Sequence, residues 1–572
     1  MRRRAADAGG RLADTHRGAV VRAVALVSSC VWYVACVPGG HVPTSDIGKT
    51  MRLGQYLARY GAWRESADRY LSVADESGRL PAPRRETPAA DYLGIARIHA
   101  TAGRIDRALA VYERLERLSP ECLDAHWERG QLLERRGEID RALDAWGQSD
   151  VARDPIRHSL ALVAAIKSPL STNQSLLDAH KAWARDHAEP PVDLDAYPLP
   201  DWQPGDRVAV AYACSFWNTD TIRFQLLPLL RRHDRRRFKV IAYAHGDPGP
   251  HVRAAVDEVH LVGALSNADY VRRVREDGVH ILVEINGHSP GHWFAAMAAR
   301  CAPVQVSYLN YTSTSGIAEV DYVIGDAIAV PAGTDRYFTE EVYRVPGCFF
   351  CFTYEDAVLP AVVPPPSAAS GIVTFGCFGS GGKINPSLLD LWAEILRRVP
   401  RSRLFLRNGE LTAADNRLAM VRAFAQRGID RARLLILPGA NRQGVLEGYA
   451  DVDISLDTFP YCGGNTIAES LWQGVPVVTL RGDRFSSAYG ASLLTASGLA
   501  DLVAGTPEEY VRKAVDLAGD AERLRVYRDN LRAWVVQFGF SDADRFTATV
   551  ETAYRDMLVR KFQPAARTGT DG

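Results

Sequence analysis

The chain has 572 residues, too many for one ordinary hydrophobic core, so we expect two or three domains. Its 68 lysine and arginine residues equal its 68 aspartate and glutamate residues, which excludes a global electrostatic attraction to nucleic acid or to an anionic membrane. With 47% hydrophobic and 24% charged residues, the composition is typical of a folded globular protein.

The first segment, residues 1–48, differs from the rest of the chain. Arginines at positions 2–4 precede an apolar run at residues 24–37 that resembles a signal-peptide core. This run is shorter than the roughly 20 residues of a membrane span. We interpret the segment as a disordered extension, with a signal as the alternative. The nine scattered cysteines suit a reducing compartment. We therefore expect a cytoplasmic protein without a membrane partner, although the apolar run leaves export or anchoring open.

A sequence repeat follows. The stretch Gly-Arg-Ile-Asp-Arg-Ala-Leu at residues 103–109 returns as Gly-Glu-Ile-Asp-Arg-Ala-Leu at residues 137–143, 34 residues later. This is the period of tetratricopeptide helix pairs, and an earlier copy begins near Gly61. We predict an all-α array over residues 51–190 with glycine at the turns. Because such arrays form curved surfaces that hold peptides, we expect a protein partner there, with a spacer or dimer contact as the alternative.

After residue 204 the pattern changes to short apolar strands that alternate with amphipathic helices, as in parallel α/β domains. A proline-rich linker separates a first domain, residues 204–360, from a second, residues 371–562. The strands predicted in the first domain are residues 208–214, 238–244, 280–285, 304–309 and 322–324. Those predicted in the second domain are residues 373–378, 403–406, 434–437, 453–456 and 475–480. We expect a cleft that faces the carboxyl ends of both sheets, where ligands of such folds bind.

The most informative motif is Leu-Asp-Thr-Phe-Pro-Tyr-Cys-Gly-Gly-Asn-Thr at residues 456–466. It predicts a buried strand, a loop and the start of a helix whose free N–H groups suit a phosphate. Glu469 follows Thr466 at capping-box spacing, and its carboxylate could equally bind ribose hydroxyls. A glycine-rich loop ending in Lys383 offers backbone amides and one ammonium group to a diphosphate. These motifs predict a nucleotide ligand.

We predict no metal site. The Asp-Val-Asp sequence at residues 451–453 is similar to a metal-binding motif, but in that motif the carboxylates follow an apolar strand, whereas here the strand comes after them.

Together these residues resemble the glycosyltransferase family of the protein O-GlcNAc transferases and the plant SPINDLY-type enzymes. The similarity extends from the repeats to about residue 553. The segments that carry it are residues 280–288, 302–306, 314–316, 383–386, 456–461 and 474–480.

The resemblance implies an α/β GT-B fold, two Rossmann-like domains preceded by the all-α tetratricopeptide-repeat array. It also implies an inverting, metal-independent transfer of GlcNAc from UDP-GlcNAc to Ser or Thr hydroxyls of a protein held by the repeats, without any cofactor beyond this donor. We assign catalytic roles to Lys383, which matches the family lysine, and to His280. The residues predicted to bind the nucleotide are Lys383, Ser380, Arg442, Gly463, Gly464, Asn465, Thr466 and Glu469.

Several positions depart from the family pattern. Thr219 stands where the family carries a histidine, Ser380 replaces a glutamine, and Arg442 replaces a lysine. Two alternatives therefore remain. One is the same fold and reaction with another donor, such as GDP-fucose. The other is a scaffold that binds proteins through its repeats and has lost catalysis. The oligomeric state stays open, a homodimer included.

Overall fold

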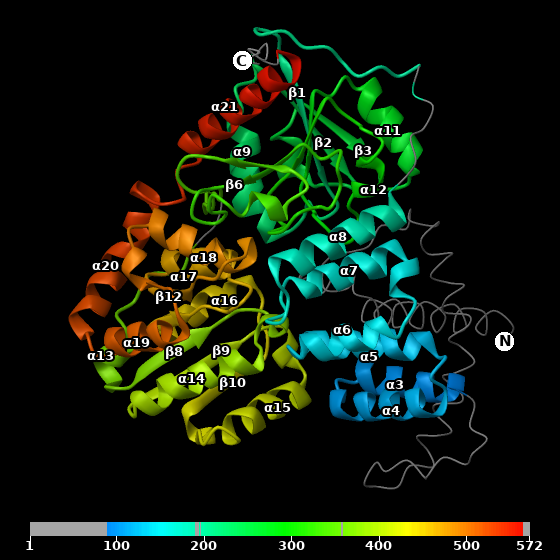
Figure 1. Ribbon diagram of the computed structural model, residues 1–572. Coiled ribbons are helices and arrows are strands. Elements are labelled where there is room, and N and C mark those ends of the chain that lie inside the picture. Colours follow the sequence, from blue (N-terminus) through cyan, green and yellow to red (C-terminus); the bar gives the residue numbers. More distant parts are fainter. Residues whose placement is uncertain (1–88, 189–193, 195, 356–358, 564–572) are drawn as a thin grey trace, which may run out of the picture. The chain divides into compact units, whose positions relative to one another are not determined.

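The computed structural model describes residues 89–188, 194, 196–355 and 359–563 (Figure 1). The predicted extension, residues 1–48, and the predicted repeat near Gly61 lie outside these residues. The chain forms two compact units, one of residues 1–132 with 413–415, the other of residues 133–412 with 416–572. Among the described helices, none has the length and apolar character needed to span a membrane.

In the first unit, α3 (Ala89–Thr101) and α4 (Ile105–Leu118) form a helix pair. Gly103 joins them with φ of +70°, a conformation that glycine adopts without steric cost. The following helix, α5 (Leu123–Arg135), contributes Glu128, whose carboxylate accepts hydrogen bonds from Arg97 and, at 2.7 Å, from the Tyr112 hydroxyl. These polar contacts fix the register of the three helices.

In the second unit, α6 (Ile139–Gly147) begins after Gly137, whose φ of +79° repeats the turn found at Gly103. A further pair follows, α7 (Pro155–Ala165) and α8 (Asn173–His187). Thr172 caps α8 by accepting the Ser175 N–H at 3.1 Å, and the Ser175 hydroxyl completes a capping box. The described helices confirm the predicted all-α repeat array and its turn glycines.

Each α/β domain contains one parallel sheet. The first has the order β3-β2-β1-β4-β5-β6-β7 and the second β10-β9-β8-β11-β12-β13. The first comprises β1 (Val208–Cys214), β2 (Phe238–Ala244), β3 (Glu258–Leu261), β4 (Ile281–Glu284), β5 (Val304–Ser307), β6 (Tyr322–Gly325) and β7 (Glu341–Arg344). The second comprises β8 (Val373–Cys377), β9 (Ser402–Arg407), β10 (Leu434–Leu437), β11 (Ile454–Leu456), β12 (Val477–Leu480) and β13 (Val503–Ala504). The order reverses between β1 and β4 and between β8 and β11, so both domains have the doubly wound, Rossmann-like topology predicted.

Helices cover both faces of the second sheet because its strands are buried on both sides. In β9, Leu404 and Leu406 join the apolar core beneath α14 (Pro386–Arg398) and α19 (Pro507–Ala518), whereas Phe405 packs with Tyr449 on the opposite face. That opposite face carries α17 (Asn465–Trp472), where the Ser470 hydroxyl lies 2.7 Å from that of Ser455 in β11. The remaining helices are α9 (Leu227–Arg232), α10 (Pro250–Arg253), α11 (Asn267–Glu276), α12 (Phe294–Met297), α13 (Pro366–Ser370), α15 (Ala414–Ala425), α16 (Arg442–Gly448) and α18 (Phe485–Ala496).

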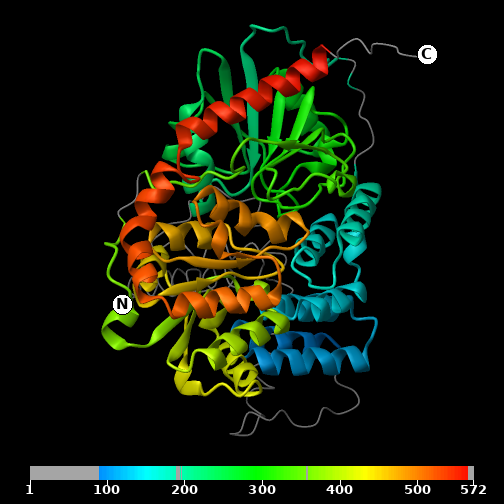
Figure 2. The same ribbon diagram turned by 60° about the vertical axis from the view of Figure 1, so that its left-hand side comes forward.

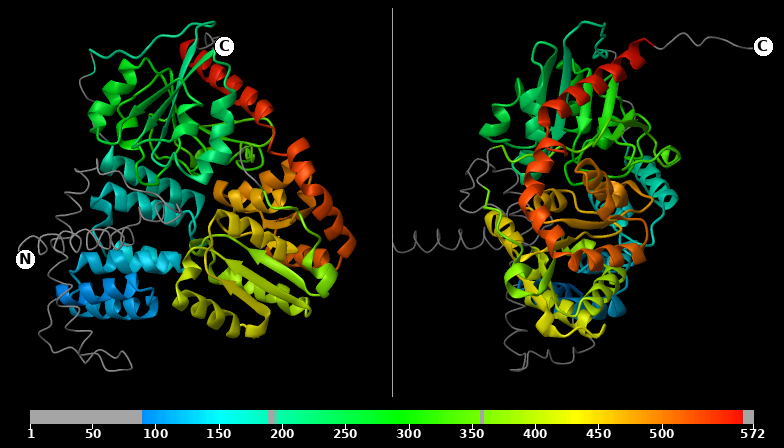
Figure 3. Two further views of the ribbon diagram at one scale, coloured as in Figure 1. Left: turned by 180° about the vertical axis from the view of Figure 1, so that it is seen from behind. Right: turned by 90° about the vertical axis from the view of Figure 1, so that its left-hand side faces the viewer.

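The last two helices, α20 (Ala521–Gln537) and α21 (Ala543–Phe562), run from the second domain back to the first (Figure 2). Both views in Figure 3 show α21, in red, along the first domain, in green. The Tyr554 hydroxyl of α21 lies 3.2 Å from that of Tyr212 in β1, and Tyr343 of β7 donates to Asp556 at 3.0 Å. The assignment of residues 371–562 to the second domain alone is therefore corrected, because α21 completes the core of the first.

A histidine-rich contact joins α7 and α8 to the first domain. The Ser159 hydroxyl of α7 lies 2.9 Å from Nε2 of His292 and 3.3 Å from Nδ1 of His288, both in the loop after β4. Nε2 of His180 in α8 lies 2.6 Å from the hydroxyl of Tyr311 in the loop after β5. Burial lowers the pKa of His180 to about 4 and that of His292 to about 3. These rings are therefore uncharged at neutral pH.

Acidification should weaken this contact. A histidine whose pKa is lower in the folded than in the unfolded chain takes up a proton on unfolding. Its contribution to stability is complete above pH 6.5 and is lost as the pH falls, for His292 toward about 3. The loss approaches about 1.4 kcal/mol per pH unit and per group. We expect the urea midpoint of unfolding to fall steeply below pH 6.5, and less steeply in His292→Gln, whose amide does not titrate. Identical slopes for the two proteins would contradict the assignment.

Candidate functional site

The loop between β11 and α17 is organised by a buried carboxylate, that of Asp457. Its Oδ1 accepts the N–H groups of Gly463 at 2.7 Å and Thr458 at 2.8 Å, and its Oδ2 accepts the Thr479 hydroxyl at 2.6 Å. Burial raises the pKa of Asp457 to about 6. Gly464 is the N-cap of α17, so the N–H groups of the first helical turn lie at the carboxyl end of β11, as predicted. This role of Asp457 was not predicted from the sequence, although its position directly after a buried strand could have indicated it.

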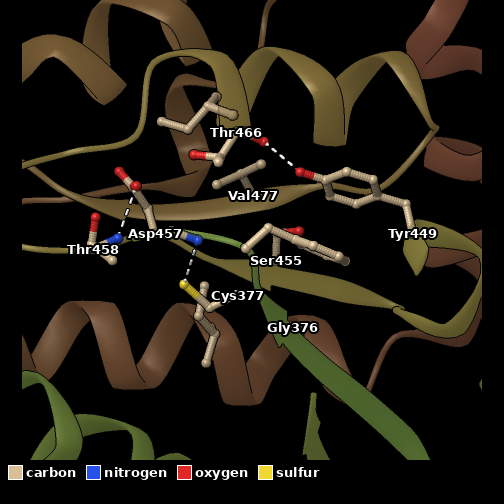
Figure 4. A pocket seen from close by; sticks show the side chains of 12 residues that line it. Gly376, Cys377, Tyr449, Ser455, Asp457, Thr458, Thr466 and Val477 are labelled. Carbon is tan, nitrogen blue, oxygen red and sulfur yellow. Dashed lines mark hydrogen bonds between the residues drawn. The ribbon is translucent and has the colours of Figure 1, made fainter. Parts of the chain in front are cut away.

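A cavity of about 20 Å³ lies beneath the start of α17 (Figure 4). Cys377 and Asp457 line it, together with Tyr449, whose hydroxyl donates to the carbonyl of Thr466 at 3.1 Å. A space of this size holds about one water molecule. The cavity therefore belongs to the floor of the site and is too small for a nucleotide.

Lys383 lies at the loop that leads into α17. Its ammonium group donates to the carbonyl of Cys462 at 3.0 Å and lies 4.2 Å from the ring centroid of Tyr461, a cation–π contact. Burial lowers the pKa of Lys383 to about 8, although Asp457 acts in the opposite direction. The structure thus brings the predicted catalytic lysine to the predicted phosphate-binding turn, with its charge only partly compensated.

The glycines before Lys383 serve a different purpose from the one predicted. The N–H of Gly381 donates to the Glu410 carboxylate at 3.1 Å, and the N–H of Lys383 donates to the Ser380 carbonyl at 3.0 Å. These amides are therefore not available to a diphosphate, which corrects the prediction that they grip one. Gly382 is buried, and a Cβ there would lie 2.9 Å from the carboxylate of Glu134. Close packing, rather than phosphate binding, explains the glycines.

Glu469 does not cap α17, because it lies in the second turn, beyond the N-cap residue Gly464. Its Oε1 accepts Nη1 of Arg442 at 2.5 Å. Arg442 also donates to the Tyr354 hydroxyl, and its guanidinium lies 5.0 Å from the ring centroid of Phe224. Burial alone would lower the pKa of Arg442, but Glu469 raises it. Burial raises the pKa of Glu469, and Arg442 acts in the opposite direction. The structure brings these two predicted residues together.

Asn465 links the start of α17 to the first domain. Its Nδ2 donates to the Thr221 hydroxyl at 3.2 Å, and its Oδ1 accepts a hydrogen bond from Gln225. Thr219, at the position of the family histidine, donates its hydroxyl to the Phe216 carbonyl at 2.9 Å. The loop after β1 therefore contributes to this site, as predicted.

His280 is not part of the site. It precedes β4, at the amino end of the sheet, whereas the site is built from the carboxyl ends of strands. Its Nδ1 accepts the N–H of Ala209 at 2.9 Å, and its Nε2 lies 3.2 Å from the Asp201 carbonyl. The catalytic role predicted for His280 is corrected accordingly: the ring joins neighbouring backbone segments.

The Arg442–Glu469 pair gives a test of the local electrostatics. Removal of one charge leaves the other buried without its partner, so Arg442→Met and Glu469→Gln should each cost about 2 kcal/mol. The double variant should cost at least about 1 kcal/mol less than the sum of the two. Urea unfolding of the four proteins measures this coupling, and strictly additive costs would show that the pair contributes nothing.

Comparisons with known proteins bear on the fold and the family of the chain. A family model described as glycosyl transferase family 41 matches residues 193–359 and 367–549, and a tetratricopeptide-repeat model matches residues 93–155. A solved O-GlcNAc transferase of Thermobaculum terrenum, a point mutant, aligns with a TM-score of 0.77 and 31% identity, covering 92% of this chain and 100% of its own. These matches agree with a repeat array followed by a GT-B fold.

Two curated relatives extend the comparison. The Hordeum vulgare protein named "Probable UDP-N-acetylglucosamine--peptide N-acetylglucosaminyltransferase SPINDLY" is 33% identical over 404 residues, 68% of this chain and 42% of its own length. The Caenorhabditis elegans "UDP-N-acetylglucosamine--peptide N-acetylglucosaminyltransferase" is 26% identical over 454 residues, 58% of this chain and 39% of its own length. The matches thus span less than half the length of these relatives. Since the family model covers more than half of this chain, the chain belongs to glycosyltransferase family 41.

Proposed function

We propose that this protein is an inverting glycosyltransferase that moves GlcNAc from UDP-GlcNAc to Ser or Thr hydroxyls of proteins held by its repeats. The observation that carries the proposal is the position of Lys383, a buried and only partly compensated ammonium group beside the loop that opens α17. The names of the two curated relatives support the donor and a peptide acceptor.

In the proposed reaction the acceptor hydroxyl oxygen attacks the anomeric carbon of the donor. The bond from that carbon to the β-phosphate oxygen breaks, and the nucleoside diphosphate leaves with the electron pair. The proton of the acceptor hydroxyl passes to a phosphate oxygen of the nucleotide, which balances the reaction. Lys383 and the first N–H groups of α17 stabilise the negative charge that grows on the diphosphate, each well-placed donor contributing a few kcal/mol. Glu469 accepts ribose hydroxyls in this proposal. The Thr219 hydroxyl donates to the Phe216 carbonyl, and we assign Thr219 no role as a base.

The proposal assigns no metal ion to the reaction. Within the described part of the chain, no three His, Cys, Asp or Glu side chains are grouped as metal ligands. Metal independence is a separate prediction, which activity in the presence of excess EDTA tests directly.

Substitution of the lysine tests the catalytic assignment. Lys383→Ala should lower the rate of sugar transfer at least about 100-fold, because it removes the charge opposite the leaving diphosphate. Circular dichroism and the unfolding midpoint should stay near those of the wild type. Lys181→Ala, a change at an exposed lysine of α8, is the matched control. Equal turnover by the wild type and Lys383→Ala would reject the proposed site.

Ligand-induced stabilisation tests the donor. A nucleotide at 100 times its Kd raises stability by about 2.7 kcal/mol. We expect UDP and UDP-GlcNAc to raise the unfolding temperature of the wild type, and to raise it less in Lys383→Ala. A shift with GDP and GDP-fucose alone would replace the proposed donor within the same fold. Shifts with none of the four would favour a protein-binding scaffold without catalysis.

A further inference from the structure

The turn that joins α5 to α6 packs directly on the loop that carries Lys383. A Cβ at Gly137 would lie 2.0 Å from the carbonyl oxygen of Ile384, and a Cβ at Gly381 would lie 2.6 Å from that of Arg135. Only glycine, which has no Cβ, permits contacts this close. The backbones of the repeat turn and of the Lys383 loop are therefore held in one fixed register.

An ion pair reinforces this contact. Oε1 of Glu134, near the end of α5, lies 2.5 Å from the ammonium group of Lys167, which follows α7. The two side chains are only 23% and 15% exposed, so water screens the pair weakly. Ile166, the neighbour of Lys167, belongs to the apolar cluster that Tyr461 joins. Lys167 is therefore held near Tyr461, whose ring makes the cation–π contact with the Lys383 ammonium group.

The charge of Lys167 reaches the catalytic lysine. Burial is the main reason for the low pKa of Lys383, and repulsion by Lys167 lowers it further, while Asp457 raises it. The titratable groups that act on Lys383 are Asp457, Lys167, Cys462 and Cys377. Those that act on Lys167 are Glu134, Tyr461 and Glu410.

We propose that Lys167, held in place by Glu134, is a positioning residue of the donor site that places a second positive charge beside Lys383. This inference rests on the proposed function, because the charge is useful only if an anion binds there. Two ammonium groups held close together repel each other in the empty site, and both are stabilised when a diphosphate arrives. The helical array would then shape the donor site as well as hold the acceptor.

The charge state of Lys383 can be measured without turnover. The chain has seven lysines. Reductive methylation with ¹³C-formaldehyde keeps their charges and gives each a titratable NMR signal, and Lys383→Arg assigns the signal of Lys383. The wild-type midpoint should lie at about 8. We expect Lys167→Met to raise it, because a repelling charge is gone, and Glu134→Gln to lower it, because Lys167 loses its counter-charge. Each shift should be about half a pH unit.

Opposite shifts from the two members of one ion pair are the distinguishing result, since loss of structure would move both variants in the same direction. Shifts of the same sign, or none in either variant, would overturn the inference. The double variant Lys167→Met/Glu134→Gln contains neither charge, so it controls for unfolding caused by one unpaired charge. The titration midpoint of Lys383 in this variant should lie above that in Glu134→Gln.

Affinity for UDP separates this inference from the proposed function. We expect the Kd for UDP, measured by calorimetry at pH 7, to rise about tenfold in Lys167→Met relative to the wild type. Unchanged affinity in a variant with a shifted Lys383 midpoint would remove Lys167 from the donor site and leave the proposed function intact. Absence of UDP binding to the wild type itself would reject the UDP donor, and with it the role given to Lys167 toward UDP.

Discussion

Burial of one ammonium group is the constraint on which the arrangement of this site depends. Removal of a charge from water costs several kcal/mol unless nearby groups replace the lost solvation. Around Lys383 the replacement consists of one carbonyl oxygen, that of Cys462, and the ring face of Tyr461. The nearby Asp457 carboxylate already accepts three hydrogen bonds, two from its own loop and one from Thr479 of β12. The compensation is therefore partial, and the site retains an attraction for an anion.

Helices α7 and α8, with the segment between them, contact both α/β domains. Toward the first domain, Ser159 of α7 and His180 of α8 contact the loops after β4 and β5. Toward the second domain, the Asn173 side chain donates to the Asp483 carbonyl at 3.1 Å, and Arg484 donates to the Ser168 carbonyl at 3.0 Å. A helix pair fixed at both sides sets the spacing of the strand-end loops between which a donor would lie. The helices after the repeats are thus packed into the same unit as the two α/β domains.

The sequence predicted the sheets well and the roles of individual polar residues poorly, for reasons that differ. All ten predicted strands are present because each contains a run of apolar residues, and most of them are buried on both faces. The two unpredicted strands of the first sheet, β3 and β7, are half-exposed and carry charged residues, so periodicity gave no signal. The capping-box interpretation of Glu469 failed because α17 begins one residue before Thr466, and boundaries set by tertiary contacts are invisible to local spacing.

Two other errors have a common cause. A histidine beside a strand can lie at either of its ends, and the assignment of His280 did not weigh which end faces the cleft. A glycine pair allows either a phosphate or another backbone segment to approach closely. At Gly381 the close neighbour is the backbone of a repeat turn. In both cases the deciding partner is remote in sequence. The position of Lys383 could be predicted because it depends on a local feature, the turn that follows β8, whereas its catalytic role stays a prediction.

The polarity of the site supports a nucleoside diphosphate more specifically than any single residue does. At the end proposed for the ribose, Arg442 pairs with Glu469 and lies 3.8 Å from a second carboxylate, that of Asp220, so this end has no excess of positive charge. At the end proposed for the phosphates, the cation of Lys383 is under-compensated, and Lys167 adds to the positive potential. A nucleoside diphosphate has the complementary distribution, a neutral polar ribose joined to an anionic diphosphate. A ligand that carried its negative charge at the opposite end would meet the Glu469 carboxylate and leave Lys383 uncompensated, so the distribution of charge favours one orientation of the donor.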